Sequence, residues 1–344
     1  MKNKLVWVIC VCLLFSCGCQ KSLDQMKAGF DALANREYEE ALDCFLKAEE
    51  AGDSSRKIYR GKGLAYMGLT QYEEAIDSLQ QALYNSPAWI DDFDYDTNYY
   101  MAVAYAKSGD PESAIKIYDG ILDLHKKDKD AYYLRGYLKA QTQDLDGALK
   151  DFKKSLELSK KDVNLYLDIF EALKSFGYEE DGKLLLEQLL LEKEKSLSNF
   201  ELARIHYDLG NYQEAKDYLD KKMDRENADQ LLLLGQVHEK LGDFNYAISL
   251  YTQFLNSHQD NAKVYNQLGL CRLDAGESEA ALEAFEKALE VEDSTMTQNL
   301  QFNKIVAYEH MGDFTTAASL MGQYLKEYPD DSAAVREYQF LETR

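Results

Sequence analysis

A small residue recurs along the chain at a nearly constant interval, usually within a frame of aromatic and acidic residues. The intervals run from 32 to 36 residues, apart from a single interval of 39. A period this regular over nine units is typical of a solenoid, in which each unit buries its apolar face only against its neighbours. The chain is therefore predicted to fold as an array of stacked units. The recurring positions are Ala41, Ala75, Ala114, Ala148, Gly182, Ala215, Ala247, Ala281 and Ala317.

Each unit is predicted to form two helices joined by a turn. In the first helix an aromatic or aliphatic residue precedes a small one by four positions, as Tyr59 precedes Gly63, so both lie on one helix face. The turn usually holds Gly followed by Asp or Asn, as in Gly109-Asp110. Gly suits the left-handed residue that ends a helix, and the polar residue caps the next one. The second helix spaces its apolar and small residues by three and four, as in Tyr72, Ala75, Leu79 and Ala82.

These features resemble the tetratricopeptide repeat family. The resemblance implies an all-α fold, a right-handed α-solenoid of about nine tetratricopeptide helix-turn-helix repeats with a C-terminal capping helix. It covers residues 22–344, and the capping helix is expected over 331–344. The repeats are expected approximately at 22–55, 56–89, 95–128, 129–162, 163–195, 196–227, 228–261, 262–297 and 298–330.

The N-terminus has the pattern of an export signal. Lys2 and Lys4 precede an apolar run from Leu5 to Phe15, which is too short to span a bilayer comfortably and suits a signal peptide. The run ends in Leu14-Phe15-Ser16-Cys17, with an aliphatic residue three positions before the Cys and a small residue directly before it. This junction resembles the bacterial lipobox.

The lipobox resemblance implies a lipoprotein signal peptide over residues 1–16, lipidation of Cys17 and a lipidated tether over 17–21. The protein would then be exported, extracytoplasmic and lipid-anchored to a bacterial membrane. Cys19 is the alternative lipidation site, although Ser16 is a poor residue three positions before it. An ordinary cleaved signal peptide or a short membrane anchor, with incidental Cys residues, would also fit this pattern.

The charge balance narrows the range of partners. There are 39 basic and 61 acidic residues, and the formal net charge is -22. A surface this acidic repels phosphate backbones and anionic membrane faces, so a nucleic acid partner is not expected. Membrane attachment would depend on the acyl chains of the N-terminal lipid anchor and not on the charge of the body.

No constellation of residues points to catalysis. The five His residues are scattered without zinc-ligand spacing, and no carboxylate pair has a distinctive spacing. His206 and His238 stand at the repeat position that Tyr66 holds in the second repeat, which predicts that they pack between helices. We therefore expect no enzyme activity and no cofactor.

A run of three alternating carboxylates, Asp92, Asp94 and Asp96, resembles the start of a calcium-binding loop. Thr97, however, stands where that loop needs glycine, and Val103 stands where it needs a bidentate Glu. We therefore expect no bound metal, and we expect Asp96 or Thr97 to cap the following helix.

The first helices of such repeats line the concave surface of the array, as the family resemblance implies. Residues there that do not serve the packing positions are candidates for peptide binding. Tyr and Phe offer a large contact area at low entropic cost, which suits an extended peptide or a partner helix. Alternatively, some of these side chains pack only against their own neighbours. The candidates are Arg60, Leu64, Met67, Tyr99, Tyr100, Val103, Tyr133, Tyr137, Phe200, Arg204, Tyr207 and Phe302.

The function expected from these features is that of a non-catalytic protein- or peptide-binding module, carried by a membrane-anchored extracytoplasmic lipoprotein. One alternative is a structural scaffold or assembly subunit of a cell-envelope complex, which would bind through large faces and not through a groove. A more remote alternative is a carbohydrate-binding or hydrolytic protein that uses the acidic concave face. The sequence does not identify the partner, because a fold does not determine a function.

Overall fold

The computed structural model describes residues 22–159, 162–291, 295–329 and 331–344. Cys17 and Cys19, the two candidate lipidation sites, lie outside these ranges. All regular elements within them are helices, which confirms the predicted all-α class. The chain divides into two compact units, Met1–Leu185 and Leu186–Arg344, and each is described by itself below. None of the described helices is both long enough and apolar enough to cross a membrane.

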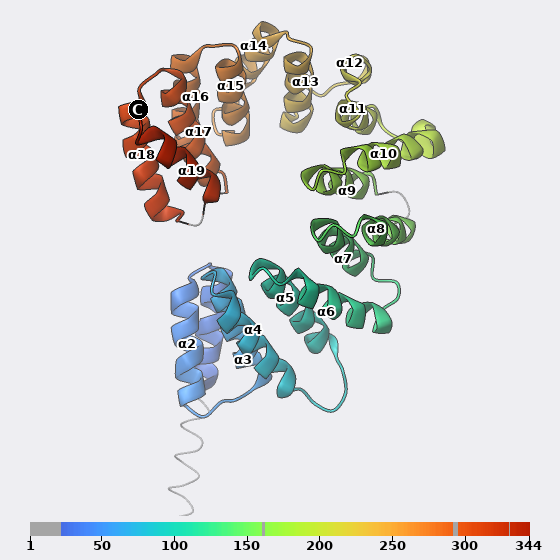
Figure 1. Ribbon diagram of the computed structural model, residues 1–344, viewed down its shortest axis with the longest axis vertical. Coiled ribbons are helices and arrows are strands. Elements are labelled where there is room, and N and C mark those ends of the chain that lie inside the picture. The colour runs from blue at the N-terminus through green and yellow to red at the C-terminus, as the bar shows by residue number, and fades with distance from the viewer. Residues whose placement is uncertain (1–21, 160–161, 292–294, 330) are drawn as a thin grey trace, which may run out of the picture. The chain divides into compact units, whose positions relative to one another are not determined.

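The first unit consists of helices that pair with their neighbours in sequence (Figure 1). Residues 22–34 are helical. The pairs that follow include α3 with α4, α5 with α6, and α7 with α8. The helices are α2 (Tyr38–Glu50), α3 (Arg56–Gly68), α4 (Tyr72–Tyr84), α5 (Asp92–Lys107), α6 (Pro111–Leu124), α7 (Lys129–Gln141), α8 (Leu145–Ser159), α9 (Val163–Ser175) and the start of α10 (Glu179–Lys193).

The second unit continues the same helix–turn–helix pattern. It begins within α10 and includes a short 3-10 helix, η1, over Glu194–Ser196. Its α-helices are α11 (Asn199–Asp208), α12 (Tyr212–Lys221), α13 (Ala228–Lys240), α14 (Phe244–Leu255), α15 (Ala262–Asp274), α16 (Ser278–Glu290), α17 (Thr297–His310), α18 (Phe314–Glu327) and α19 (Ser332–Leu341).

The turns within the pairs have the predicted chemistry. Gly109 and Gly312 have φ angles of 89° and 79°, in the left-handed region that glycine adopts without strain. The following Asp110 caps α6 by accepting a hydrogen bond from the Ser113 backbone N–H. Asp313 caps α18 in the same way. Each Gly-Asp turn therefore ends one helix and starts the next.

The small residues lie where two helices of a pair approach closely. Ala148 on α8 is fully buried. A Cβ added to Gly136 on α7 would lie 2.9 Å from the ring of Phe152 and 3.2 Å from the Ala148 carbonyl oxygen. Since real Cβ atoms do not approach so closely, the packing of α7 on α8 favours glycine, which has no Cβ, at position 136. The period in the sequence thus reflects repeated close contacts between paired helices.

The insertion between α4 and α5 differs from the prediction. Asp96 and Thr97 do not cap the helix, because α5 begins earlier, with Asp91 as its N-cap. Asp91 and Asp94 form a reciprocal capping box. Arg56 on α3 holds both carboxylates, with Nη2 at 2.6 Å from Asp91 Oδ2 and Nη1 at 3.4 Å from Asp94 Oδ1. The calcium-like carboxylates are therefore helical, and this helix start depends on a cation from the preceding repeat.

Candidate functional site

The candidate binding residues lie mainly on one layer of helices in each unit. In the first unit α3 contacts α5, and α7 contacts α9. In the second unit α11 contacts α13, α13 contacts α15, and α15 contacts α17. Figure 1 shows α5 and α7 on one side of their unit and α6 and α8 on the other. The first helices of successive repeats thus contact one another from α11 to α17 in the second unit, and as the two pairs α3–α5 and α7–α9 in the first.

Arg60 on α3 is held by the neighbouring repeat. Its guanidinium carbon lies 3.7 Å from the ring centroid of Phe93, and its Nη1 atom lies 3.9 Å from Asp96 Oδ2. Burial lowers the pKa of Arg60. The adjacent candidates Leu64 and Met67 are half-buried. Met67 packs against the buried cluster of Ala75, Ile76, Leu79, Met101 and Ala104.

Tyr99 on α5 serves the packing of its own unit. Its hydroxyl donates a hydrogen bond to Asp128 Oδ2 over 2.6 Å, and its ring meets Tyr118 edge-to-face at 5.6 Å. Burial raises the pKa of Tyr99. Asp128 also caps α7, so Tyr99 links α5 to the start of the next repeat. Tyr100 is 38% exposed, and Val103 is half-buried.

The two candidates on α7 differ in exposure. Tyr133 lies against Phe152 with ring centroids 5.9 Å apart, and burial raises its pKa. Tyr137 is 37% exposed and meets Phe176 edge-to-face at 5.0 Å. Tyr100 and Tyr137 are therefore the most exposed of the candidate tyrosines in the first unit, whereas Tyr99 and Tyr133 belong partly to the core.

The candidates of the second unit are half-buried aromatic residues and one cation. On α11 the guanidinium carbon of Arg204 lies 5.9 Å from the Phe200 ring centroid. Tyr207 packs on Tyr212 of α12, with ring centroids 5.6 Å apart. Phe302 on α17 meets Tyr324 of α18 at 5.9 Å. The contacts of Tyr207 and Phe302 join the two helices of a repeat, so these side chains contribute to packing as well as to the surface.

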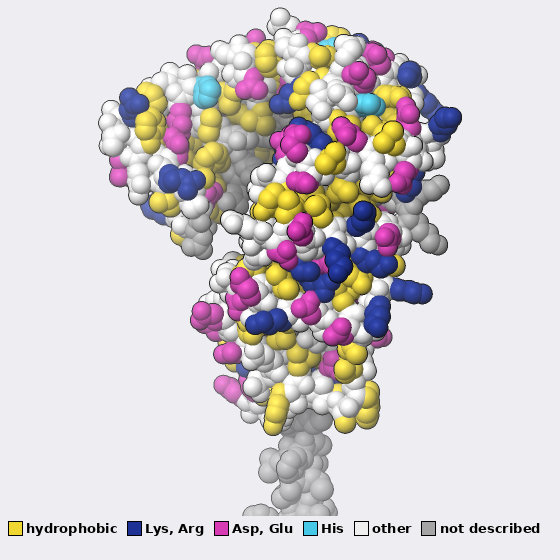
Figure 2. Space-filling view, turned by 45° about the vertical axis from the view of Figure 1, so that its right-hand side comes forward, with side chains coloured by type: hydrophobic (Ala, Val, Ile, Leu, Met, Phe, Trp, Pro, Cys, Tyr) yellow, Lys and Arg dark blue, Asp and Glu magenta, His cyan; other side chains and the backbone are white. Residues whose placement is uncertain are grey.

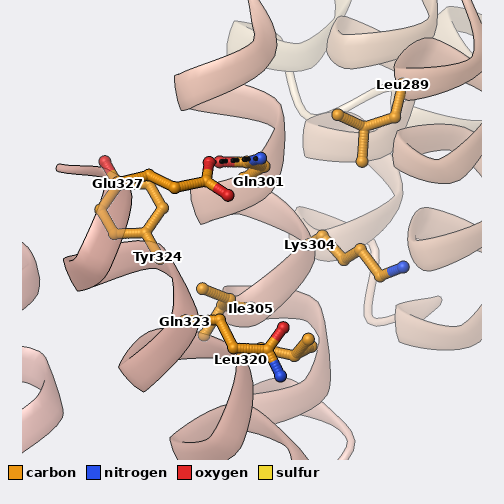
Figure 3. Close-up of a pocket in the computed structure, with 8 residues that line it drawn as sticks. All are labelled: Leu289, Gln301, Lys304, Ile305, Leu320, Gln323, Tyr324 and Glu327. Atoms are coloured by element: carbon orange, nitrogen blue, oxygen red, sulfur yellow. Dashed lines mark hydrogen bonds between the residues drawn. The ribbon is translucent and has the colours of Figure 1, made fainter.

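A pocket that the sequence analysis did not predict lies between α16, α17 and α18 in the second unit. Its volume is about 180 Å³. Gln301 and Glu327 approach each other across it, with Gln301 Nε2 donating to Glu327 Oε2 over 3.3 Å (Figure 3). Lys304 lies on the same stretch of α17 and pairs with Glu286 at 2.8 Å. Polar residues at these positions are indistinguishable in sequence from an ordinary solvated helix face.

The two histidines singled out in the sequence contact aromatic rings in the described structure. The described residues contain no group of three or more His, Cys, Asp or Glu side chains that could hold a metal ion. His206 stacks on Tyr218 at 5.3 Å, and His238 lies 4.1 Å from the Tyr246 ring, which confirms their predicted packing role between paired helices. Figure 2 shows hydrophobic side chains among Asp and Glu on the visible face, with Lys and Arg gathered at the level of α6 to α8.

Comparison with protein families identifies the repeat. Models described as tetratricopeptide repeat match residues 26–88 and 232–296, 66–138, 129–162 and 197–225, and 300–331. Together these matches cover well over half of the chain. The chain therefore belongs to the tetratricopeptide repeat family, whose members generally act as non-catalytic scaffolds that bind proteins or peptides.

The curated relative that the chain matches shares only low sequence identity with it. The small glutamine-rich tetratricopeptide repeat-containing protein 2 of Saccharomyces cerevisiae is 26% identical over 106 residues, which are 30% of this chain. The match spans only 29% of that relative's own length.

Solved structures of tetratricopeptide repeat proteins are similar to parts of the chain. TTC0263 of Thermus thermophilus is 20% identical, with a TM-score of 0.43, over 53% of this chain and 100% of that one. A protein of Parabacteroides merdae is 16% identical, with a TM-score of 0.46, over 74% and 99%. YrrB, described as having an unusual peptide-binding site, is 18% identical, with a TM-score of 0.36, over 64% and 97%.

Proposed function

We propose that this protein is a non-catalytic binding module that holds an extended peptide or a partner helix on its layer of first helices. The observation that carries the proposal is the exposure of Tyr100 and Tyr137. These two side chains are 38% and 37% exposed on the first helices of successive repeats. Half-exposed tyrosines are typical anchors for a bound partner, because they offer a large amphipathic area with few rotatable bonds.

The neighbouring candidate residues pack into the helices that carry these two exposed tyrosines. Tyr99 and Tyr133 pack against buried rings, and Arg60 lies over Phe93, so the exposed tyrosines stand on an ordered layer. A rigid surface loses little conformational entropy on binding. The same packing contacts also suit the scaffold alternative, in which these side chains mainly join repeats and the partner is held through other faces.

Replacing Tyr100 and Tyr137 together by Ala is expected to weaken the complex at least tenfold. Aromatic anchors commonly contribute ~2 kcal/mol or more each, and ~1.4 kcal/mol already gives a factor of ten. The partner would first be isolated on the immobilised protein, then purified and titrated by calorimetry. Tyr84→Ala is the matched control, because Tyr84 is 85% exposed on a second helix. Unchanged affinity in the folded double variant would favour the scaffold role.

We further propose that the module is exported and held at a bacterial membrane by lipid on Cys17. The proposal rests on the charged start, the short apolar run and the Leu14-Phe15-Ser16-Cys17 junction. The full chain has a net charge of -22, so its acidic body has no electrostatic attraction to an anionic membrane surface, and an acyl anchor would be needed to keep it there.

Cys17→Ser is expected to release the protein from the membrane fraction or to leave its signal peptide uncleaved. The serine hydroxyl does not replace the thiol in thioether formation, so no diacylglyceryl group is attached. Fractionation and mass spectrometry of the N-terminus would measure both effects. Cys19→Ser is the matched control and should change neither. The opposite result, with Cys19→Ser alone abolishing attachment, would move the lipidation site to Cys19.

A further inference from the structure

The last helix of the second unit, α19, docks on the helices before it through one narrow face (Figure 1). Ala334 and Leu341 are the buried residues of α19, and both lie in one apolar cluster with Ile305 of α17. Val335 and Phe340, elsewhere on the same helix, are exposed. Because so few residues of α19 are buried, a polar group within this contact has a large influence on how firmly the helix docks.

A pair of carboxyl groups lies within that contact. Glu337 stands three residues after Ala334 and four before Leu341, so it shares the docking face of α19. Glu309 stands four residues after the buried Ile305, on the corresponding face of α17. The Glu309 carboxyl is within hydrogen-bond reach of the Glu337 carboxyl. Its Oε1 atom is buried and accepts no hydrogen bond, so a proton held between the two carboxyls is what would satisfy it.

No cation neutralises this pair. Among the residues that the structure describes, no Lys, Arg or His forms an ion pair with either carboxyl. Two carboxyl groups this close cannot both ionise without repulsion, so one of them keeps its proton more firmly than usual. The cations on these helices and their neighbours are paired elsewhere or exposed: Lys304 with Glu286 at 2.8 Å, Arg272 at 4.0 Å from Glu277, and the exposed Arg336 and His310.

The other titratable groups at the ends of α18 and α19 keep their charge state near neutral pH. Asp331 caps α19 and accepts a hydrogen bond from the Tyr324 hydroxyl over 2.6 Å. That bond lowers the pKa of Asp331, and burial raises the pKa of Tyr324 to about 12. Hydrogen bonds from Thr316 likewise lower the pKa of Asp313, which caps α18. In contrast, burial and then the charge of Glu337 raise the pKa of Glu309 to about 7.

We propose that α19 is a proton-controlled cap, docked while Glu309 and Glu337 share one proton and loosened when both carboxyls are ionised. The docked state holds a proton that the undocked state releases, because the pKa of Glu309 is raised from 4.5 to about 7 on docking. Docking therefore strengthens as the pH falls from about 7 towards 4.5, and it weakens as the pH rises through about 7. Loosening uncovers the apolar cluster around Ile305 and Met321. This device is independent of the binding surface proposed above.

Hydrogen exchange of the full chain, followed by mass spectrometry, tests the proposal. The quantity measured is the protection factor of residues 332–341, corrected for the chemical exchange rate, at about pH 5.5 and about pH 8.5. It is expected to fall about tenfold or more at the higher pH, whereas that of α13 stays the same. Glu309→Gln should abolish this difference and keep α19 protected at both pH values, because its amide donates to Glu337 as the shared proton does. Glu337→Gln should act in the same way.

Two matched controls identify the group that titrates. His310→Gln removes the exposed imidazole beside Glu309, and Glu342→Gln removes an exposed carboxyl at the end of α19. Both should keep the pH difference. Equal protection of α19 at the two pH values in the unmodified chain would overturn the proposal, as would a pH difference that persists in Glu309→Gln. Loss of the difference in His310→Gln would assign it to the imidazole and not to the carboxyl pair.

Discussion

Phe152→Ala is expected to lower the free energy of unfolding by about 3–5 kcal/mol. The Phe152 side chain is fully buried on α8, in a cluster shared with α7 and α9. Its removal leaves a cavity that α7 cannot fill without moving, because Gly136 opposite has no side chain. Each repeat is stabilised mainly by its neighbours, so the loss should appear as a lower urea midpoint for the first unit. Tyr84→Ala, at an 85% exposed site, should change stability by less than ~0.5 kcal/mol.

The same pair of positions allows a test of the packing register itself. Gly136→Ala alone should destabilise, since its Cβ would lie 2.9 Å from the Phe152 ring. Combined with Phe152→Leu, the alanine should be tolerated better than the sum of the two changes predicts, because the smaller side chain gives it room. Additive effects in this double-mutant cycle would contradict the contact between positions 136 and 152.

The period of small residues could be predicted because its cause is local and repeated. Ala148, like its counterparts in other repeats, sits where paired helices touch, and only a small side chain fits there. A turn such as Gly109-Asp110 is equally local, since its backbone geometry and its cap involve adjacent residues. Features that depend on neighbours within about one helical hairpin therefore follow from the sequence pattern.

The candidate site was less predictable because it depends on contacts between repeats. The sequence does not show that the Tyr99 hydroxyl donates a hydrogen bond to Asp128, whereas the side chain of Tyr100 beside it stays exposed. Nor does it tell that Arg56 from the preceding repeat holds Asp91 and sets the start of α5. The period specifies which positions face the partner helix but does not distinguish a surface tyrosine that packs from one that is available to a ligand.

A buried ion cluster between α7 and α8 was also not anticipated from the sequence. Asp151 on α8 is only 2% exposed. Arg135 on α7 holds it with two hydrogen bonds, from Nε over 2.8 Å and from Nη2 over 2.6 Å. Lys139 adds a third, also of 2.8 Å. Burial alone would lower the pKa of Arg135, but the hydrogen bonds and charges of Asp151, and then of Asp119, raise it. The carboxylate is stable there only because two cations surround it.

Arg135→Ala is therefore expected to cost about 3 kcal/mol, the lower end of the range for breaking a buried ion pair. The cost arises because Asp151 stays buried, and it is moderated because Lys139 remains 2.8 Å away. Urea denaturation at neutral pH would measure it. Lys154→Ala is the matched control on the same helix pair. Its partner Glu157 is 59% exposed, so the change should stay within ~0.5 kcal/mol.

A variant in which both partners of the ion pair are replaced distinguishes the effect of the buried charge from the loss of packing contacts. Arg135→Met combined with Asp151→Leu removes the buried carboxylate together with its main cation and fills similar volumes. This double variant should recover most of the stability lost in Arg135→Ala. If it is as unstable as Arg135→Ala, the guanidinium contributes through its contacts with α6 and α8 and not through the charge of Asp151. The bond from Arg135 Nη1 to Asp119 on α6, at 2.6 Å, would then be the interaction to remove next.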